Sequence, residues 1–179
     1  MSTNVKNLTR IAIMTAVICV LGPLSLPIGP VPISLTPLAC FLAVYILGTA
    51  RGTLAYVIYL LIGLAGVPVL SGFSGGPGKL FGPTGGYLIG FIPMAVIGGI
   101  FIHRFYQKLY LQAAGMILGL AVCYLFGTAW LAYQANMDFA AAAAVGVYPF
   151  VILDLIKIAV AILLGRAVRN ALVKANLLN

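Results

Sequence analysis

Two charged side chains stand three positions apart inside a long apolar stretch near the C-terminus. Asp154 and Lys157 lie within residues 145–168, about 10 Å from the start of that stretch if it is helical. Residues three apart share one face of a helix. A charge in the middle of a bilayer costs about 3 kcal/mol on insertion scales, so the pair is expected to face a bundle interior or a wet cavity. Two interpretations stay open, an ion pair that only stabilises the bundle and a polar anchor for a ligand.

A glycine-rich loop at residues 71–85 is the second candidate site. Glycine permits positive φ and a close approach of the backbone to a ligand, and proline stiffens a turn. Both types recur here, and the loop also carries a cation, a serine and two aromatic residues. The members that could contact a ligand are Phe73, Ser74, Gly75, Gly76, Lys79 and Phe81. These features predict a lid over a pocket, with a tight surface loop as the plain alternative.

The same loop contains a pattern found in serine hydrolases, because Gly72-Phe-Ser-Gly-Gly76 reads G-x-S-x-G. A serine nucleophile needs a base within hydrogen-bond reach. The single histidine, His103, is expected at the far end of the segment 84–102, about 28 Å away by helix rise. Lys157 remains a candidate base, so an intramembrane serine hydrolase is the alternative from another functional class. We predict that the protein is not an enzyme and has no catalytic residue. We expect no metal site either, because one His, two Asp and no Glu do not make an ordinary metal centre.

The elements that must position these residues are membrane helices. Of the 179 residues 63% are hydrophobic and 7% are charged, with a mean hydropathy of +1.17. A soluble domain is about 25% charged. Apolar segments of about 20 residues, enough to cross a bilayer as helices, are predicted at 8–26, 33–50, 53–70, 84–102, 111–133 and 145–168. Strands are not expected, because open sheet edges are not tolerated in lipid. The sequence predicts an all-α membrane protein with one domain, residues 1–179.

The formal net charge of +8 predicts the orientation rather than a nucleic-acid partner, because the cations are dispersed at segment ends. With six spans, one face of the membrane carries almost all of them: Lys6, Arg10, Arg51, Arg104, Lys108, Arg166, Arg169 and Lys174. The other face carries Lys79. Cytoplasmic loops are enriched in Lys and Arg, so both termini are predicted to be cytoplasmic and the long loops outside.

Four stretches stand out as motifs: Val31-Pro-Ile-Ser-Leu35, Gly66-Val-Pro-Val-Leu-Ser-Gly-Phe-Ser-Gly-Gly-Pro-Gly78, Gly82-Pro-Thr-Gly-Gly-Tyr-Leu-Ile-Gly90 and Asp154-Leu-Ile-Lys157. Together they resemble the BioY family, the biotin-binding S components of energy-coupling factor (ECF) transporters. The resemblance covers almost the whole chain. It departs at Thr36-Pro37, where Gln-Thr would be expected.

The resemblance implies the six-helix S-component bundle in a prokaryotic cell membrane, with biotin bound under the outer loops. It also implies partners: a transmembrane coupling subunit, which docks on the small residues Ala12 and Ala16, and two ATPase subunits that hydrolyse ATP. No cofactor is implied for this chain. An S component for another vitamin, such as thiamine or riboflavin, is the closest alternative.

The chemistry of biotin suggests a role for each candidate. The ureido ring has two N–H donors and one acceptor, so Asp154 and Lys157 could bind both kinds of group. The valerate carboxylate needs a cation or backbone N–H groups, which Lys79 and the loop around Ser74, Gly75 and Gly76 could supply. The fused ring needs apolar walls, for which Phe73, Phe81 and Tyr87 are candidates.

Overall fold

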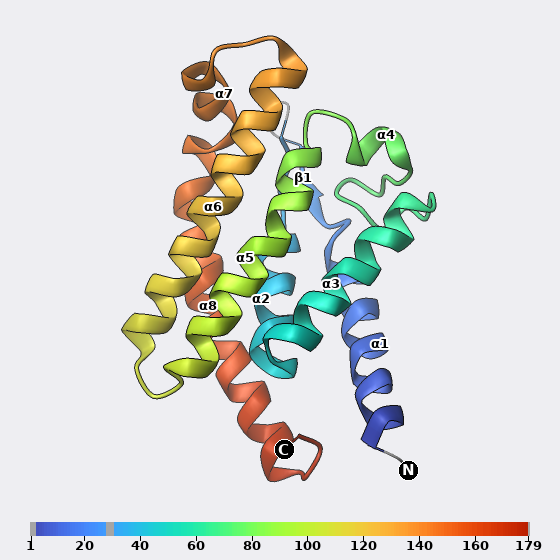
Figure 1. Ribbon diagram of the computed structural model, residues 1–179, viewed down its shortest axis with the longest axis vertical. Coiled ribbons are helices and arrows are strands. Elements are labelled where there is room, and N and C mark those ends of the chain that lie inside the picture. The colour runs from blue at the N-terminus through green and yellow to red at the C-terminus, as the bar shows by residue number, and fades with distance from the viewer. Residues whose placement is uncertain (1–2, 28–30, 179) are drawn as a thin grey trace.

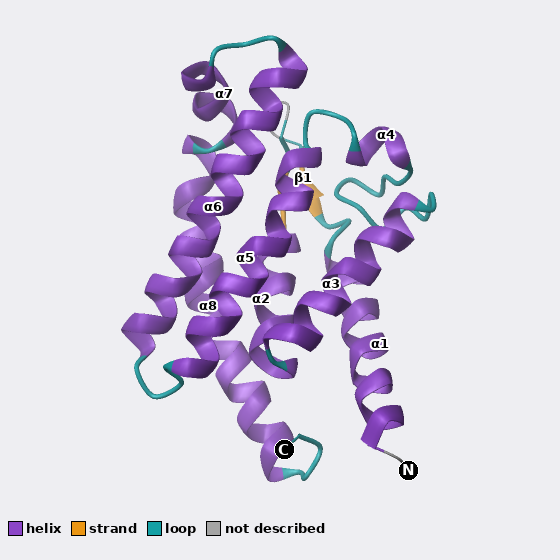
Figure 2. Cartoon of the chain, in the orientation of Figure 1, coloured by secondary structure: helices purple, strands orange, loops and turns teal. Residues whose placement is uncertain are grey.

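The protein is a bundle of helices packed along one long axis, with both ends of the chain at the same end of the bundle (Figure 1). The structure, a computed structural model, describes residues 3–27 and 31–178. Its regular elements are mostly helical (Figure 2). In chain order they are α1 Thr3–Leu21, β1 Ser25–Leu26, β2 Ile33–Ser34, α2 Thr36–Leu47, α3 Thr49–Leu64, α4 Pro77–Leu80, α5 Gly85–Arg104, α6 Leu109–Ala135, α7 Phe139–Gly146 and α8 Tyr148–Lys174.

Glycine and proline set most helix boundaries. α1 ends one residue before Gly22-Pro23, and Pro23 has no backbone N–H to continue the helix. α2 begins with Pro37 in its first turn and ends at Gly48, whose φ of +92° is reached easily only by glycine. The sharp turn at Gly48 makes α2 and α3 12 and 16 residues long, shorter than the segments of about 20 expected from the sequence.

One short pair of strands was not expected. β1 and β2 pair antiparallel, with Ser25 opposite Ser34 and Leu26 opposite Ile33. The segment 8–26 was predicted to be helical to its end, but α1 stops at Leu21 and residues 25–26 join this hairpin. The hairpin has two residues in each strand, too few to cross a membrane. It lies toward the end of the bundle that carries the glycine-rich loop, opposite the termini, which we call the loop end (Figure 1). Residues 28–30 of the loop between the first two predicted segments lie outside the described residues.

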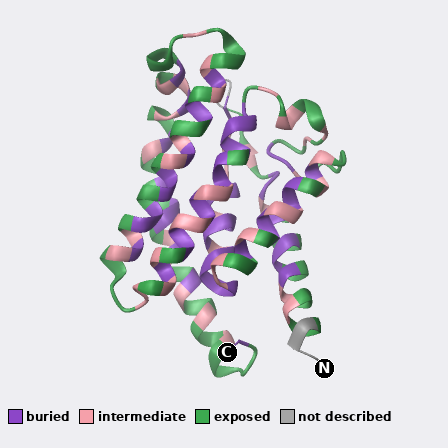
Figure 3. Ribbon diagram, viewed as in Figure 1, coloured by how far each residue is buried: buried purple, intermediate pink, exposed green. Residues whose placement is uncertain are grey.

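The core is centred on α2 and α5 (Figure 3). α2 packs against α1, α3, α5 and α8, and nearly all of its side chains are buried. A helix that is apolar all round belongs inside a bundle. α5 packs along α6, where Gly115 and Gly119 let the two helices approach closely: a Cβ at Gly119 would lie 2.8 Å from the carbonyl oxygen of Met94. The small residues of α6 therefore serve packing within the chain.

Large apolar side chains cover the outside of the bundle. Examples are Leu8 and Val20 on α1, Leu125 on α6, and Ile152 and Leu163 on α8, each at least 60% exposed. Soluble monomers rarely expose apolar surface on this scale. α5 and α6 are long and apolar enough to cross a membrane, and α7 with α8, bent by 46°, make a third span if the bent pair is counted as one.

Candidate functional site

The buried ion pair predicted from the sequence forms between Asp154 and Lys157. The Lys157 Nζ lies 2.7 Å from the Asp154 Oδ1. Asp154 is 5% exposed and Lys157 is 9% exposed. Asp154 is the seventh residue of α8, about 9 Å along that helix from its start at the loop end of the bundle. Both side chains point into the bundle rather than toward lipid, as expected for charged groups in a membrane segment.

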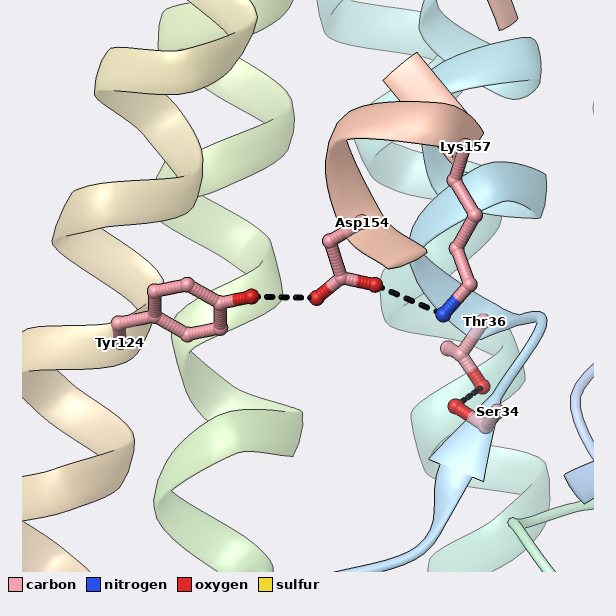
Figure 4. Close-up of polar contacts among 5 residues, drawn as sticks. All are labelled: Ser34, Thr36, Tyr124, Asp154 and Lys157. Atoms are coloured by element: carbon pink, nitrogen blue, oxygen red, sulfur yellow. Dashed lines mark hydrogen bonds and ion pairs between the residues drawn. The ribbon is translucent and has the colours of Figure 1, made fainter. Parts of the chain in front are cut away.

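Tyr124 on α6 holds the other oxygen of the carboxylate. Its hydroxyl donates a hydrogen bond of 2.6 Å to the Asp154 Oδ2, so the two oxygens of Asp154 have different partners (Figure 4). A carboxylate oxygen can accept more than one hydrogen bond. The sequence did not single out Tyr124, since its one signal was a hydroxyl in the apolar run 111–133. Which helix it faces depends on how α6 is rotated in the bundle.

The ammonium of Lys157 points from α8 toward the start of α2 (Figure 4). Thr36 lies there, fully buried, and its Oγ1 is 3.1 Å from the Ser34 Oγ. An ammonium has three N–H donors. Among the described residues Asp154 is the hydrogen-bond partner found for the Lys157 Nζ. Thr36 opens the stretch Thr36-Pro37, where Gln-Thr was expected from the sequence resemblance, and this stretch begins beside the ion pair (Figure 4).

The glycine-rich loop is tied to the end of α3. The Gly76 N–H donates 2.7 Å to the Gly63 carbonyl, and Gly76 has a φ of +86°. A Cβ on Gly75 would lie 2.4 Å from the Val67 carbonyl oxygen, which makes this position specific for glycine. The loop also contacts its neighbours, because the Gly72 N–H donates 3.1 Å to the carbonyl of Pro23, just after α1. The loop end of the bundle is therefore held by backbone contacts.

The predicted ligand contacts of this loop lie in different surroundings. Lys79 sits on α4 and is half-buried, and burial lowers the pKa of its ammonium below the ordinary value. Phe73 and Phe81 are 67% and 58% exposed, and Phe73 has the unusual φ of +54°. The loop thus carries two exposed aromatic rings on either side of a cation in the sequence, and contact of either ring with a ligand stays a prediction.

Ser74 is engaged within its own turn. Its Oγ donates 2.8 Å to the Ser71 carbonyl, and its backbone pairs with Leu70. The imidazole of His103, in the last turn of α5, is hydrogen-bonded to the Val44 carbonyl at 2.8 Å and lines the same cavity as Lys6 and Asn176. Neither contact resembles the nucleophile and base pair that a serine hydrolase requires.

Tyr87 is buried between α5, α6 and α7. Its hydroxyl lies 3.4 Å from the Thr128 Oγ1, and its ring fills the space beside Gly127 and Gly146. It therefore contributes to helix packing near the site, and its contact with a ligand remains a prediction.

Ala12 and Ala16 lie on an exposed face of α1. They line an apolar groove between α1 and α3, together with residues such as Leu8 and Ile58. Two small side chains four apart leave room for a second helix to approach closely.

Comparison with known proteins decides the family. The sequence model of the BioY family matches residues 1–174. The chain belongs to the BioY family. The biotin transporter BioY of Thermotoga maritima is 41% identical over 160 residues, covering 89% of this chain and 94% of the relative. The biotin transporter BioY2 of Lactococcus lactis subsp. cremoris is 35% identical over 175 residues, covering 98% and 96%.

A solved structure has the same fold. The crystal structure of the S-component for biotin from an ECF-type ABC transporter superposes with a TM-score of 0.86 at 32% sequence identity, over 95% of each chain. The match confirms that the fold is that of an S component, as expected from the sequence, and the protein is a membrane protein of a transporter family. The number of spans and the side on which the termini lie stay predictions.

Proposed function

We propose that this chain is the substrate-binding subunit of a biotin uptake transporter, which captures biotin at the outer membrane face. The observation that carries the proposal is the buried Asp154–Lys157 pair, held by Tyr124. Support comes from the BioY family match and from relatives named as biotin transporters. The chain itself catalyses no reaction.

The pair offers both kinds of hydrogen bond that the ureido ring of biotin needs. Asp154 can accept from ureido N–H groups, because each of its oxygens has one protein partner. Lys157 can donate to the ureido carbonyl with an N–H that Asp154 does not use. Hydrogen bonds to charged groups are about twice as strong as neutral ones, so the pair is suited to hold an uncharged polar ring.

The valerate end of biotin would reach toward the loop. Lys79 supplies a cation there, and the backbone N–H groups of Ser74, Gly75 and Gly76 supply further donors. Phe73 and Phe81 are exposed and would turn inward as the loop closes over the fused ring, next to Tyr87.

We further propose six spans, with both termini in the cytoplasm of a prokaryotic cell. α2 is about 18 Å long by helix rise, less than the bilayer core. Irregular backbone is tolerated at membrane depth where it is buried in protein, and α2 is surrounded by other helices. The groove at Ala12 and Ala16 would receive the transmembrane coupling subunit, with ATP hydrolysed by two partner ATPases.

The test separates a ligand anchor from an ion pair that only supports the fold. Asp154→Asn leaves Lys157 buried without its counter-ion, and breaking a buried pair from one side costs about 3–5 kcal/mol of stability. The double variant Asp154→Asn/Lys157→Met removes both charges and should recover most of that stability. Biotin titration of the purified double variant should still show little binding. Near-native affinity in a stable double variant would remove the pair from the binding site.

A vitamin panel tests the substrate itself. A ligand that binds only the folded state raises its stability in proportion to the logarithm of 1 + [L]/Kd. Biotin should raise the unfolding temperature, whereas thiamine and riboflavin should not. A shift with one of the other vitamins in place of biotin would reassign the substrate.

A further inference from the structure

A basic cavity lies at the end of the bundle opposite the glycine-rich loop, between the beginning of α1 and the segment that follows α8. It encloses about 340 Å³, within the range of small-ligand sites. Its wall comes from α1, α2, α3, α5, α8 and the segment after α8. The residues that line it include Lys6, Asn7, Arg10, Arg51, His103 and Arg169.

No carboxylate side chain balances these cations. The sequence has two acidic residues, Asp138 and Asp154. Asp138 accepts from the Ala140 N–H at the start of α7, and Asp154 pairs with Lys157. The cavity therefore has a strongly positive wall and favours an anion.

Two of the lining groups are already used to build the wall. Arg169 donates from its Nη1 to the carbonyls of Tyr45 and Ile46, at 3.1 and 3.2 Å, and His103 binds Val44. The side chains of the other cations have weaker hydrogen bonds or none among the described residues. Arg10 makes a long contact of 3.4 Å with Asn7, and within residues 3–27 and 31–178 no hydrogen-bond partner is found for the side chains of Lys6 and Arg51.

An apolar groove of about 440 Å³ continues from the cavity along α1. The two hollows share Lys6 and Arg10, so charge lies at one end of a continuous surface. Beyond them the groove is lined by Ile13 and Met14 of α1 and by Leu172 and Leu177 at the end of the chain. The combination matches a molecule with an anionic head and an apolar tail.

We propose that the cavity and the groove together bind one anionic phospholipid. Its phosphate would lie against Lys6, Arg10 and Arg51, and an acyl chain would lie in the groove against Ile13 and Leu177. Basic pockets between membrane helices bind anionic lipid headgroups. A bound lipid would join α1 and α3 to the C-terminal segment, far from the proposed biotin site.

The test measures lipid binding to the full-length protein in detergent by native mass spectrometry. Dioleoyl-phosphatidylglycerol should bind at least fivefold more tightly than dioleoyl-phosphatidylcholine, which has the same chains and no net charge. Each basic residue near an anionic headgroup contributes about a factor of five. Arg10→Gln/Arg51→Gln should therefore weaken phosphatidylglycerol binding about 25-fold. Arg10→Lys/Arg51→Lys should retain most of it.

The matched control removes the same amount of charge elsewhere. Arg104 and Lys108 are exposed, lie at the same end of the bundle and do not line the cavity. Arg104→Gln/Lys108→Gln should leave phosphatidylglycerol binding within twofold. Equal binding of the two lipids, or an equal loss in the control variant, would overturn the proposal.

A further arm separates a lipid from free phosphate. Ile13→Asn/Leu177→Asn interrupts the groove and should weaken phosphatidylglycerol binding at least fivefold, whereas glycerol 3-phosphate, which lacks the tail, should compete poorly. Effective competition by glycerol 3-phosphate or inorganic phosphate, together with a neutral groove variant, would assign the cavity to a soluble phosphate instead. Size-exclusion profiles and unfolding temperatures in detergent check that each variant is folded.

Discussion

Asp154 is a carboxylate whose direction is fixed from two sides. Lys157 on the same helix holds Oδ1, and Tyr124 on α6 holds Oδ2. The oxygens therefore present their remaining lone pairs in defined directions before a ligand arrives. Pre-organisation of this kind raises affinity, because less conformational freedom is lost on binding.

Tyr124→Phe tests this fixed orientation. Removing the hydroxyl takes away a hydrogen bond to a charged group, worth about 1.5–3 kcal/mol. Biotin affinity, measured by calorimetric titration, should fall between about tenfold and a hundredfold. Tyr133→Phe is the matched control, because Tyr133 lies on the same helix and is 79% exposed. An equal change in the two variants would argue against a role for Tyr124 in positioning Asp154.

The pH dependence of binding tests Lys79. Burial lowers the pKa of the Lys79 ammonium below its ordinary value of 10.5, so its charge is lost earlier as the pH rises. The carboxylate of biotin stays ionised over that range. Affinity should be constant near pH 7 and fall at alkaline pH as the Lys79 ammonium loses its proton. In Lys79→Gln the affinity should be lower and flat at the same pH values. A decline of equal size in the variant would assign the effect to another group.

The sequence predicted some of these residues and not others. The spacing of Asp154 and Lys157 and the cost of charge in lipid were enough to predict a buried pair, because both facts are local to one helix. Tyr124 and Thr36 come to the pair from other helices, and nothing in their neighbourhoods specifies that rotation. Phe73 has a positive φ, which no local rule predicts for phenylalanine.

At the scale of elements, the glycine-rich loop is joined to the end of α3 by the hydrogen bond from the Gly76 N–H to the Gly63 carbonyl. Gly75→Ala places a Cβ against the Val67 carbonyl, and Gly76→Ala forces a left-handed backbone that costs about 1–2 kcal/mol. Each variant should weaken biotin binding about fivefold or more, measured by titration. Gly78→Ala is the control, because Gly78 has no positive φ and open space where its Cβ would stand. A loss of affinity in Gly78→Ala alone would contradict this account of the loop.

The elements were predicted best where apolar length decided them. α5 and α6 match the segments 84–102 and 111–133 to within a few residues. The segment 145–168 corresponds to α8, which begins at Tyr148 after a 46° bend at Val147. What was not predicted is α7, because residues 139–144 lay outside every predicted segment and a run of alanines before a bend can form a helix or a loop.

At the scale of the whole molecule, charge is divided between the two ends of the bundle. The termini and the turns α2–α3 and α5–α6 lie together at one end (Figure 1). Those parts carry most of the Lys and Arg residues, whereas the loop end carries Lys79. This division is the physical basis for the proposed orientation, since cations are retained on the cytoplasmic side. The proposed lipid cavity and the proposed biotin site lie toward opposite ends of the bundle.

Cysteine labelling in intact cells measures that orientation directly. Cys40 and Cys123 are fully buried, so a background with Cys19→Ala should react little with a membrane-impermeant maleimide. In this background Lys79→Cys should be labelled from outside. Lys174→Cys, in the last turn of α8, should be labelled only after the membrane is permeabilised. The reverse pattern would place the glycine-rich loop in the cytoplasm, where it could not receive biotin from the medium. The six-span arrangement puts three spans between residues 79 and 174, so these positions should lie on opposite sides of the membrane. Labelling of both positions from outside would require an even number of spans between them and would contradict that arrangement.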